Sequence, residues 1–200
     1  MSLLSWVSIL GLIIIFYSLS VLISIILRTR SSFIMLMVLS LVAYLGSNLT
    51  YLISPDFLTV IRWFNFSSLV LLVSSLFSLI RESKPIFARF PSYLIYLPFI
   101  TLLFFPLVTD QNVITNLLLG TFQVGCVIVG IFMFGISQIK NKDSLLQLIG
   151  AFIFLSAISL FWFTPVLPDN KVVITEMLII AGILITSIGL RKKYLIKNID

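Results

Sequence analysis

The stretch TVIRWFNF, residues 59–66, lies within a largely apolar segment that runs from Phe57 to Ile80. A segment of this length can cross a membrane as one helix, because a span needs about 20 apolar residues that each rise about 1.5 Å. A charge inside hydrocarbon is costly, yet Arg62 stands in this segment and Asn65 follows three residues later. Arg62 therefore requires a polar partner or a function, and the rest of the sequence has candidates for both.

The composition indicates that lipid surrounds this chain. Of its 200 residues, 60% are hydrophobic and 10% are charged, and the mean hydropathy is +1.21. A soluble domain carries about 25% charged residues, and no long polar segment separates the apolar ones here. We therefore predict an all-α integral membrane protein in which residues 1–200 form a single transmembrane domain, without a soluble domain.

Seven apolar segments are long enough to be spans. They are residues 3–27, 32–54, 57–80, 91–109, 113–138, 144–167 and 172–190. The fourth is the shortest and contains Pro98 and Pro106, so six spans and one re-entrant segment form the alternative. The first segment lacks the basic region and the small-residue cleavage site of a signal peptide, and we expect it to remain in the membrane as a span.

The basic residues indicate the orientation of this seven-helix bundle. Eleven of the thirteen Lys and Arg residues lie in alternate gaps between the spans and in the C-terminal tail. The opposite gaps carry Asp56, Asp110, Asp169 and only Lys171. Because cytoplasmic loops are enriched in Lys and Arg, we predict an N-terminus outside and a cytoplasmic C-terminus. Anionic lipid headgroups on the basic side account for the net charge of +6, so we expect a lipid bilayer and no nucleic acid as partner.

Two absences limit the chemistry. The chain has no histidine and one cysteine, Cys126. This excludes bis-histidine haem, zinc or iron held by histidine, and a nucleophile activated by histidine. One thiol cannot form an internal disulfide or a redox pair. We therefore expect no enzymatic activity, no haem and no metal.

Two charged residues remain inside the predicted spans, Arg62 and Glu176. Arg62 lies five residues past Phe57, and Glu176 lies four past Val172, in two spans that both run from outside to inside. Both residues therefore lie about 6–8 Å below the outer end of their helix. Opposite charges at equal depth predict that Arg62 and Glu176 meet, directly or through one water molecule.

Other strongly polar residues gather in the same outer half of the bundle. They are Asn48, Asn65, Asn116 and, deeper, Gln123. Together with Arg62 and Glu176 they form either an outward-facing pocket that binds a ligand or a polar lock that fixes the helix register. Three glycines at positions 125, 130 and 135 are too widely spaced for a GxxxG motif, but we expect them to allow close helix packing.

Several segments resemble the seven-transmembrane N-terminal sensor region of bacterial histidine kinases and related signalling proteins. They are RTR (28–30), LVAYLGSNLTYLISPDFLTVIRWFNF (41–66), YLIYLPFITLLFFPLVTD (93–110), and a last span that runs into a basic segment. The resemblance, which covers most of the chain, implies that the bundle senses a signal and passes it down the last helix to a kinase, cyclase or similar output domain. The sequence ends ten residues after position 190, so we expect the output domain in a separate protein or in a continuation of the chain.

These observations predict a non-enzymatic sensor or receptor-like module in the bacterial inner membrane, with a protein partner at its cytoplasmic face or C-terminal tail. One alternative is a structural or accessory subunit of a larger membrane complex. Another is a small-solute carrier or substrate-binding subunit, although the sequence shows no convincing internal repeat. Rhodopsins share the predicted topology, but residues 172–190 lack the central lysine that binds retinal, so we expect no retinal.

Overall fold

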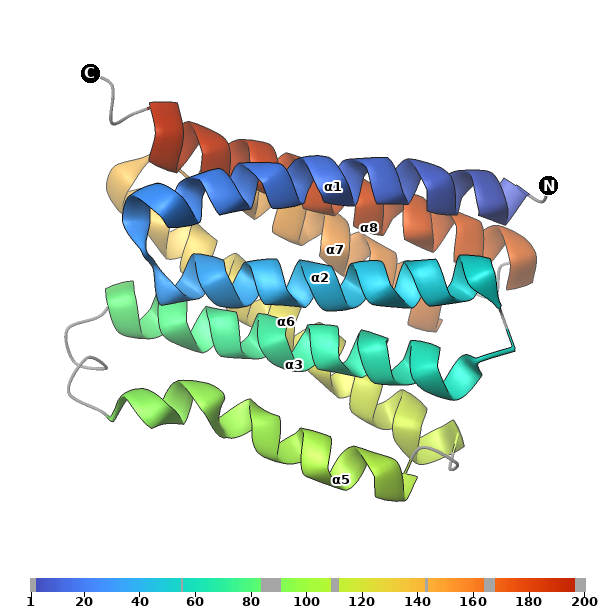
Figure 1. Ribbon diagram of the computed structural model, residues 1–200. Coiled ribbons are helices and arrows are strands. Elements are labelled where there is room, and N and C mark those ends of the chain that lie inside the picture. Colours follow the sequence, from blue (N-terminus) through green and yellow to red (C-terminus); the bar gives the residue numbers. More distant parts are fainter. Residues whose placement is uncertain are drawn as a thin grey trace. The chain divides into compact units, whose positions relative to one another are not determined.

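The structure is a computed structural model that describes residues 3–54, 56–83, 91–108, 112–142, 144–163 and 168–196 (Figure 1). Its helices are α1 (Leu3–Thr29), α2 (Ser32–Ile53), α3 (Leu58–Ser83), the 3₁₀ helix η1 (Ser92–Phe99), α5 (Ile100–Val108), α6 (Asn112–Asn141), α7 (Leu145–Phe163), α8 (Pro168–Arg191) and the π-helical turn η2 (Lys192–Ile196). The described residues contain no strand, so the all-α prediction is confirmed.

In the part of the chain that the structure describes, six helices are long and apolar enough to cross a membrane, namely α1, α2, α3, α6, α7 and α8. They coincide with six of the seven predicted spans, and their ends differ from the predicted ones by at most four residues. Runs of this length and composition identify a multi-pass membrane protein.

The remaining predicted span is a helix of mixed type. Eight residues of η1 wind as a 3₁₀ helix and nine of α5 as an α-helix, with Pro98 in the first part and Pro106 in the second. A proline lacks an N–H group and clashes with the carbonyl four residues before it. Because a 3₁₀ helix rises about 2.0 Å per residue and an α-helix about 1.5 Å, the segment extends about 30 Å, the thickness of a hydrocarbon core. The length of residues 92–108 is therefore compatible with the predicted fourth span.

The chain divides into two compact units, which are described separately. The central unit is Arg30–Cys126, and the terminal unit is Met1–Thr29 with Val127–Asp200. Helix α6 contributes its first half to the central unit and its second half to the terminal unit. Since the terminal unit takes residues from both ends of the chain, the units are not consecutive halves of the sequence.

In the central unit, α2 and α3 lie side by side (Figure 1). The Ser40 hydroxyl donates to the carbonyl of Ser68 at 2.8 Å. Gly46 lets the two helices approach, because a Cβ atom there would lie 2.8–3.1 Å from the ring of Phe64. Hydroxyl-to-carbonyl contacts and small residues are the usual means of helix association in lipid, where the hydrophobic effect does not act between helices.

A carboxylate from the end of α3 caps the start of α2. The Ser31 hydroxyl donates to Glu82 Oε2 at 3.0 Å, and the Phe33 N–H donates to Oε1 at 3.3 Å. The Ser78 hydroxyl also donates to Oε1, at 3.2 Å. The first N–H groups of a helix have no partner within it and carry partial positive charge. Glu82 satisfies one of them and thereby joins the ends of α2 and α3.

We expect Glu82→Ala to lower the free energy of unfolding by about 1 kcal/mol, the usual effect of losing a helix N-cap. Thermal unfolding of the purified protein in detergent measures it. Ser83→Ala is the matched control, because the bonds that the Ser83 hydroxyl makes to described residues are to the carbonyls of Leu79 and Ile80, within its own helix. Equal melting temperatures for the two variants would show that Glu82 does not stabilise the α2–α3 pair.

The core of the central unit is aromatic. The rings of Phe66 on α3 and Phe105 on α5 stack with centroids 4.3 Å apart. Trp63 meets the edge of Phe105 at 5.0 Å, and Phe122 on α6 meets Phe66 at 5.4 Å. Phe66 and Phe105 are fully buried, so these contacts hold α3, α5 and the first half of α6 together.

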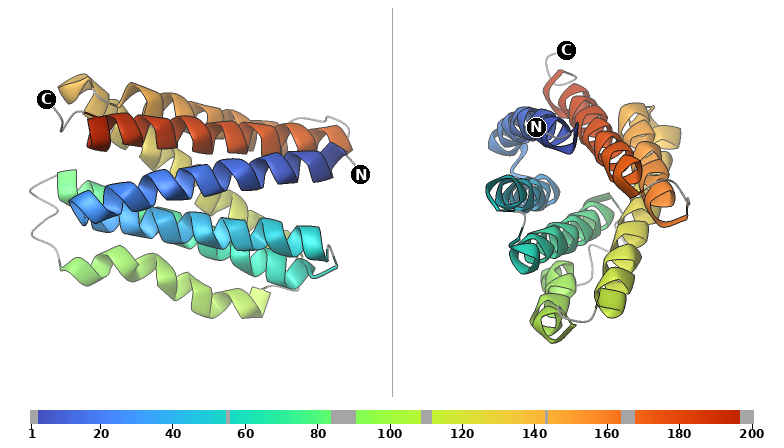
Figure 2. Two further views of the ribbon diagram at one scale, coloured as in Figure 1. Left: turned by 45° about the horizontal axis from the view of Figure 1, so that its top comes forward. Right: turned by 90° about the vertical axis from the view of Figure 1, so that its right-hand side faces the viewer.

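In the terminal unit, α8 packs against α1 on one side and α7 on another (Figure 2). Against α1 it uses branched apolar side chains, since Val173 and Ile180 cluster with Val7. The contact between α7 and α8 uses glycines of both helices. A Cβ atom added at Gly189 would lie 2.8 Å from the Cβ of Leu146, and one added at Gly150 would overlap Thr186 Oγ1.

The prediction of close packing at the glycines of residues 113–138 is wrong. A Cβ atom at Gly130 or Gly135 would find its nearest neighbour at 3.9 or 4.0 Å, an ordinary van der Waals distance. At Gly125 no described atom comes within 4 Å. Glycines allow close approach elsewhere, between α2 and α3 at Gly46 and between α7 and α8, because these glycines face a neighbouring helix.

Gly150→Ala should lower the free energy of unfolding by about 1–3 kcal/mol, the range for overpacking a tight contact. Its methyl group would overlap Thr186 and lie 3.1 Å from the Gly182 carbonyl oxygen, a backbone atom that cannot move without separating α7 and α8. Gly135→Ala is the control, and we expect it to be neutral or stabilising because alanine favours a helix over glycine. If the two variants melt alike in detergent, α7 and α8 do not pack as described.

Candidate functional site

The six predicted site residues fall in both units. Asn48 lies on α2, Arg62 and Asn65 on α3, Asn116 and Gln123 on α6, and Glu176 on α8. The first five belong to the central unit and Glu176 to the terminal unit. Asn116 is exposed, and the other five are half-buried.

Arg62 and Asn65 lie on a strip of α3 between its two packing faces. One face, which includes Ser68, contacts α2, and another, which includes Phe66, contacts α5 and α6. At 100° per residue, Arg62, Asn65 and Leu69 share the strip between them. Helical periodicity thus places Trp63 and Phe66 of TVIRWFNF in the aromatic core, with Arg62 and Asn65 on the strip beside it. Phe64 is exposed.

Helix α6 contacts α3 beside this strip and runs in the same direction as α3. Phe66 contacts Phe122, and one turn further along both helices the Cys126 thiol lies 3.9 Å from the Leu69 carbonyl oxygen. Because residue numbers increase in the same direction from one contact to the next on both helices, α3 and α6 run parallel. We call this contact line the α3–α6 seam.

The seam brings Asn65 and Gln123 to the same level and the same side. Asn65 precedes Phe66 by one residue, and Gln123 follows Phe122 by one. In two parallel right-handed helices whose Phe residues face each other, these positions turn toward the same side of the seam. Arg62 lies one turn before Phe66 and about 40° from it, toward that side. By helical periodicity, Arg62, Asn65 and Gln123 therefore lie toward one side of the seam.

Asn48 and Asn116 are the other two predicted site residues of the central unit. Asn48 Nδ2 donates to the Tyr44 carbonyl of its own helix at 3.0 Å, which leaves its amide oxygen to accept another hydrogen bond. Asn116 follows Thr115, a buried residue whose hydroxyl donates to the Val108 carbonyl at 2.6 Å. Thr115 turns inward, so Asn116 turns about 100° away from it and is exposed.

A second polar cluster, at the other end of α6, was not predicted. The hydroxyl oxygens of Ser137 and Ser144 lie 2.7 Å apart, and Lys193 Nζ donates to them at 3.3 and 3.4 Å. The Ser144 N–H donates to Gln138 Oε1 at 2.8 Å. In the sequence, Lys193 stands only as one of the basic residues of the tail. The signal for the cluster is Ser144 directly before α7, a position where serine commonly caps a helix.

The chemistry of the seam suits hydrogen bonding. Arg62 has five N–H donors, and the amides of Asn65 and Gln123 each donate and accept. Among the described residues, no group of three or more His, Cys, Asp or Glu side chains could hold a metal ion. No family model, curated protein or solved structure matches the chain. The interpretation of the site therefore rests on its own geometry.

The predicted contact between Arg62 and Glu176 is tested by removing the charges singly and together. Replacing a buried ion pair by apolar residues is often neutral or stabilising, whereas removing one partner strands a charge. We expect Arg62→Met and Glu176→Leu each to lower the melting temperature in detergent, and the double variant to recover it. Additive losses in the double variant would mean that the two side chains do not meet.

Proposed function

We propose that this chain is a sensor or receptor-like module of the bacterial inner membrane. It spans the membrane seven times, with the N-terminus outside and the C-terminus in the cytoplasm. The α3–α6 seam, with Arg62, Asn65 and Gln123, binds a polar signal molecule in the outer half of the membrane. The chain catalyses no reaction and passes the signal to a protein at its cytoplasmic face.

The observation that carries this proposal is the continuity of α6. This helix holds Asn116 and Gln123 in its first half and Ser137 and Gln138 near its last turn. A continuous helix moves as a rigid element, so a shift or rotation of α6 at the seam moves Ser137 relative to Lys193. Lys193 lies two residues past the end of α8, and the resemblance to sensor regions assigns the output to the last helix.

The arrangement of the units supports a sensor over a carrier. A small-solute carrier of this size would consist of two related halves. The central unit here is one contiguous stretch, whereas the terminal unit combines both ends of the chain. This division offers no pair of consecutive halves that could alternate around a central site.

Hydrogen exchange tests the relay without requiring the signal molecule. We expect Gln123→Leu, which removes the amide from the seam, to change the exchange rate of the Ser144 N–H and of neighbouring amides in detergent, because a shifted α6 alters the bond to Gln138 Oε1. Leu117→Ala is the control, since Leu117 is 69% exposed on the same helix. Unchanged exchange at Ser144 in Gln123→Leu would contradict a relay through α6.

The partner is tested in cells with a photo-crosslinking residue at Lys192, which is exposed at the end of α8. The proposal predicts a cytoplasmic signalling protein whose crosslinking yield changes in Gln123→Leu. A membrane protein captured with the same yield in both backgrounds would instead identify the chain as an accessory subunit.

A further inference from the structure

The terminal unit contains a pocket between α1 and the end of α8 that the proposed function does not use. It has a volume of about 280 Å³ and is lined by Tyr17, Ser20, Val21, Ser24, Arg191 and Leu195. Arg191 ends α8 and Leu195 lies in η2, so all lining residues belong to the terminal unit.

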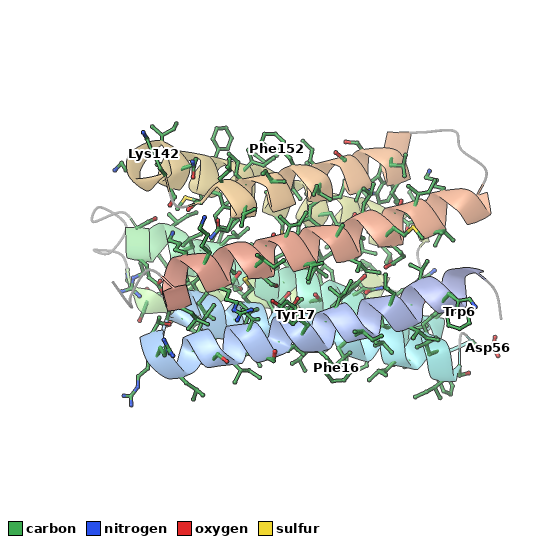
Figure 3. All side chains as sticks on the ribbon, turned by 90° about the horizontal axis from the view of Figure 1, so that it is seen from above. Trp6, Phe16, Tyr17, Asp56, Lys142 and Phe152 are labelled. Carbon is green, nitrogen blue, oxygen red and sulfur yellow. The ribbon has the colours of Figure 1, made fainter. Side chains whose placement is uncertain are left out.

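Arg191 reaches along α1 toward the middle of that helix. Its Nη1 donates to the Tyr17 hydroxyl oxygen at 3.4 Å. Tyr17 lies well inside α1, eleven residues before Arg28 in the last turn of that helix, which is about 16 Å along the helix axis. Helical side chains lean toward the N-terminus of their helix, and this lean carries the guanidinium into the bundle. Figure 3 shows Tyr17 on the side of α1 toward α8, whereas Phe16 points away.

The pocket gives this cation hydroxyl groups rather than a carboxylate. None of its six lining residues is acidic. Arginine has five N–H donors, of which one contacts Tyr17. Tyr17 accepts that bond and keeps its own O–H to donate, and the Ser20 and Ser24 hydroxyls, which now bond carbonyls of their own helix, can rotate to donate. This set of donors around one positive charge suits a phosphate group.

The exposed face of α1 has the polarity of a phospholipid. Leu10, Ile13, Tyr17, Ser20 and Ser24 follow each other at three- and four-residue intervals, so they share one face of the helix. All five are exposed, and the face changes from apolar at Leu10 and Ile13 to hydroxyl-bearing at the last three. Acyl chains fit against the first part, and a headgroup fits the pocket at the second.

We infer that this pocket binds the phosphate headgroup of an anionic phospholipid, with Arg191 as counter-ion and the Tyr17 hydroxyl as second donor. The lipid's glycerol lies against Val21 and Leu195, and its chains follow Leu10 and Ile13. This inference is independent of the proposed signal site, which uses other residues.

Native mass spectrometry of the full chain in detergent, titrated with phosphatidylglycerol or phosphatidylcholine, tests the inference. We expect Arg191→Gln to weaken phosphatidylglycerol binding about tenfold, since charge-assisted hydrogen bonds are the strong ones. Phosphatidylcholine carries the same phosphate but also a choline cation, so its binding should weaken by a smaller factor. Lys192→Gln is the matched control, because it removes the same charge one residue outside the pocket lining. Equal weakening by both variants would overturn the site in favour of general charge attraction.

Two further measurements separate lipid binding from a folding defect and from binding of free phosphate. Tyr17→Phe removes one hydroxyl and should weaken phosphatidylglycerol binding by a smaller factor with no change in melting temperature. Inorganic phosphate at millimolar concentration should not displace the lipid, because it lacks acyl chains. Displacement by phosphate, or full binding in Tyr17→Phe, would reject the lipid site.

Discussion

The interior of a bilayer has no water, so a polar group within the helices gains its hydrogen bonds inside the protein. Many hydroxyl side chains do so, although those of Ser18, Ser74, Thr175, Thr186 and Ser187 have no partner in the described part of the chain. Ser24 and Thr50 donate to carbonyls four residues earlier in their own helices. Others cross to a neighbouring helix, as Ser40 does to Ser68. Because a hydroxyl that bonds its own helix cannot hold a neighbour, packing depends largely on shape, through stacked rings in the central unit and glycines in the terminal unit.

Charge placement conflicts with backbone conformation at two helix ends. Arg30 after α1 and Lys142 after α6 have φ angles of 50° and 55°, the left-handed region that glycine usually occupies after a helix. A side chain there costs about 1 kcal/mol. Both residues lie in gaps that carry the basic charges of the chain. Their positive charges also face the negative ends of the helix dipoles, which offsets part of the strain.

The sequence predicts features that depend on composition, and it misses those that depend on which helices contact each other. The ends of α1 and α2 lie within two residues of prediction, because apolar length decides them. Gly150 and Gly135 look alike in sequence, yet only Gly150 meets a neighbouring helix closely. Glu82 looks like a loop charge until α3 places it beside Ser31. Once α3 and α6 are known to meet at Phe66 and Phe122, the sequence order shows that Asn65 and Gln123 lie on the same side of the seam. The sequence does not show that the two helices meet.

The two sides of α8 contact their neighbours through different side chains. Toward α7, glycine contacts and the fully buried Gln147, whose amide atoms have no hydrogen-bond partner in the described part of the chain, leave no room for sliding. A buried amide without a partner costs about 1–3 kcal/mol, a cost that persists only where the surrounding packing is strong. Toward α1, branched apolar side chains make the contact, and a pocket lies beside the end of α8. In the proposed relay, α7 and α8 therefore act as one rigid pair, which the Ser137–Lys193 contact joins to the end of α6.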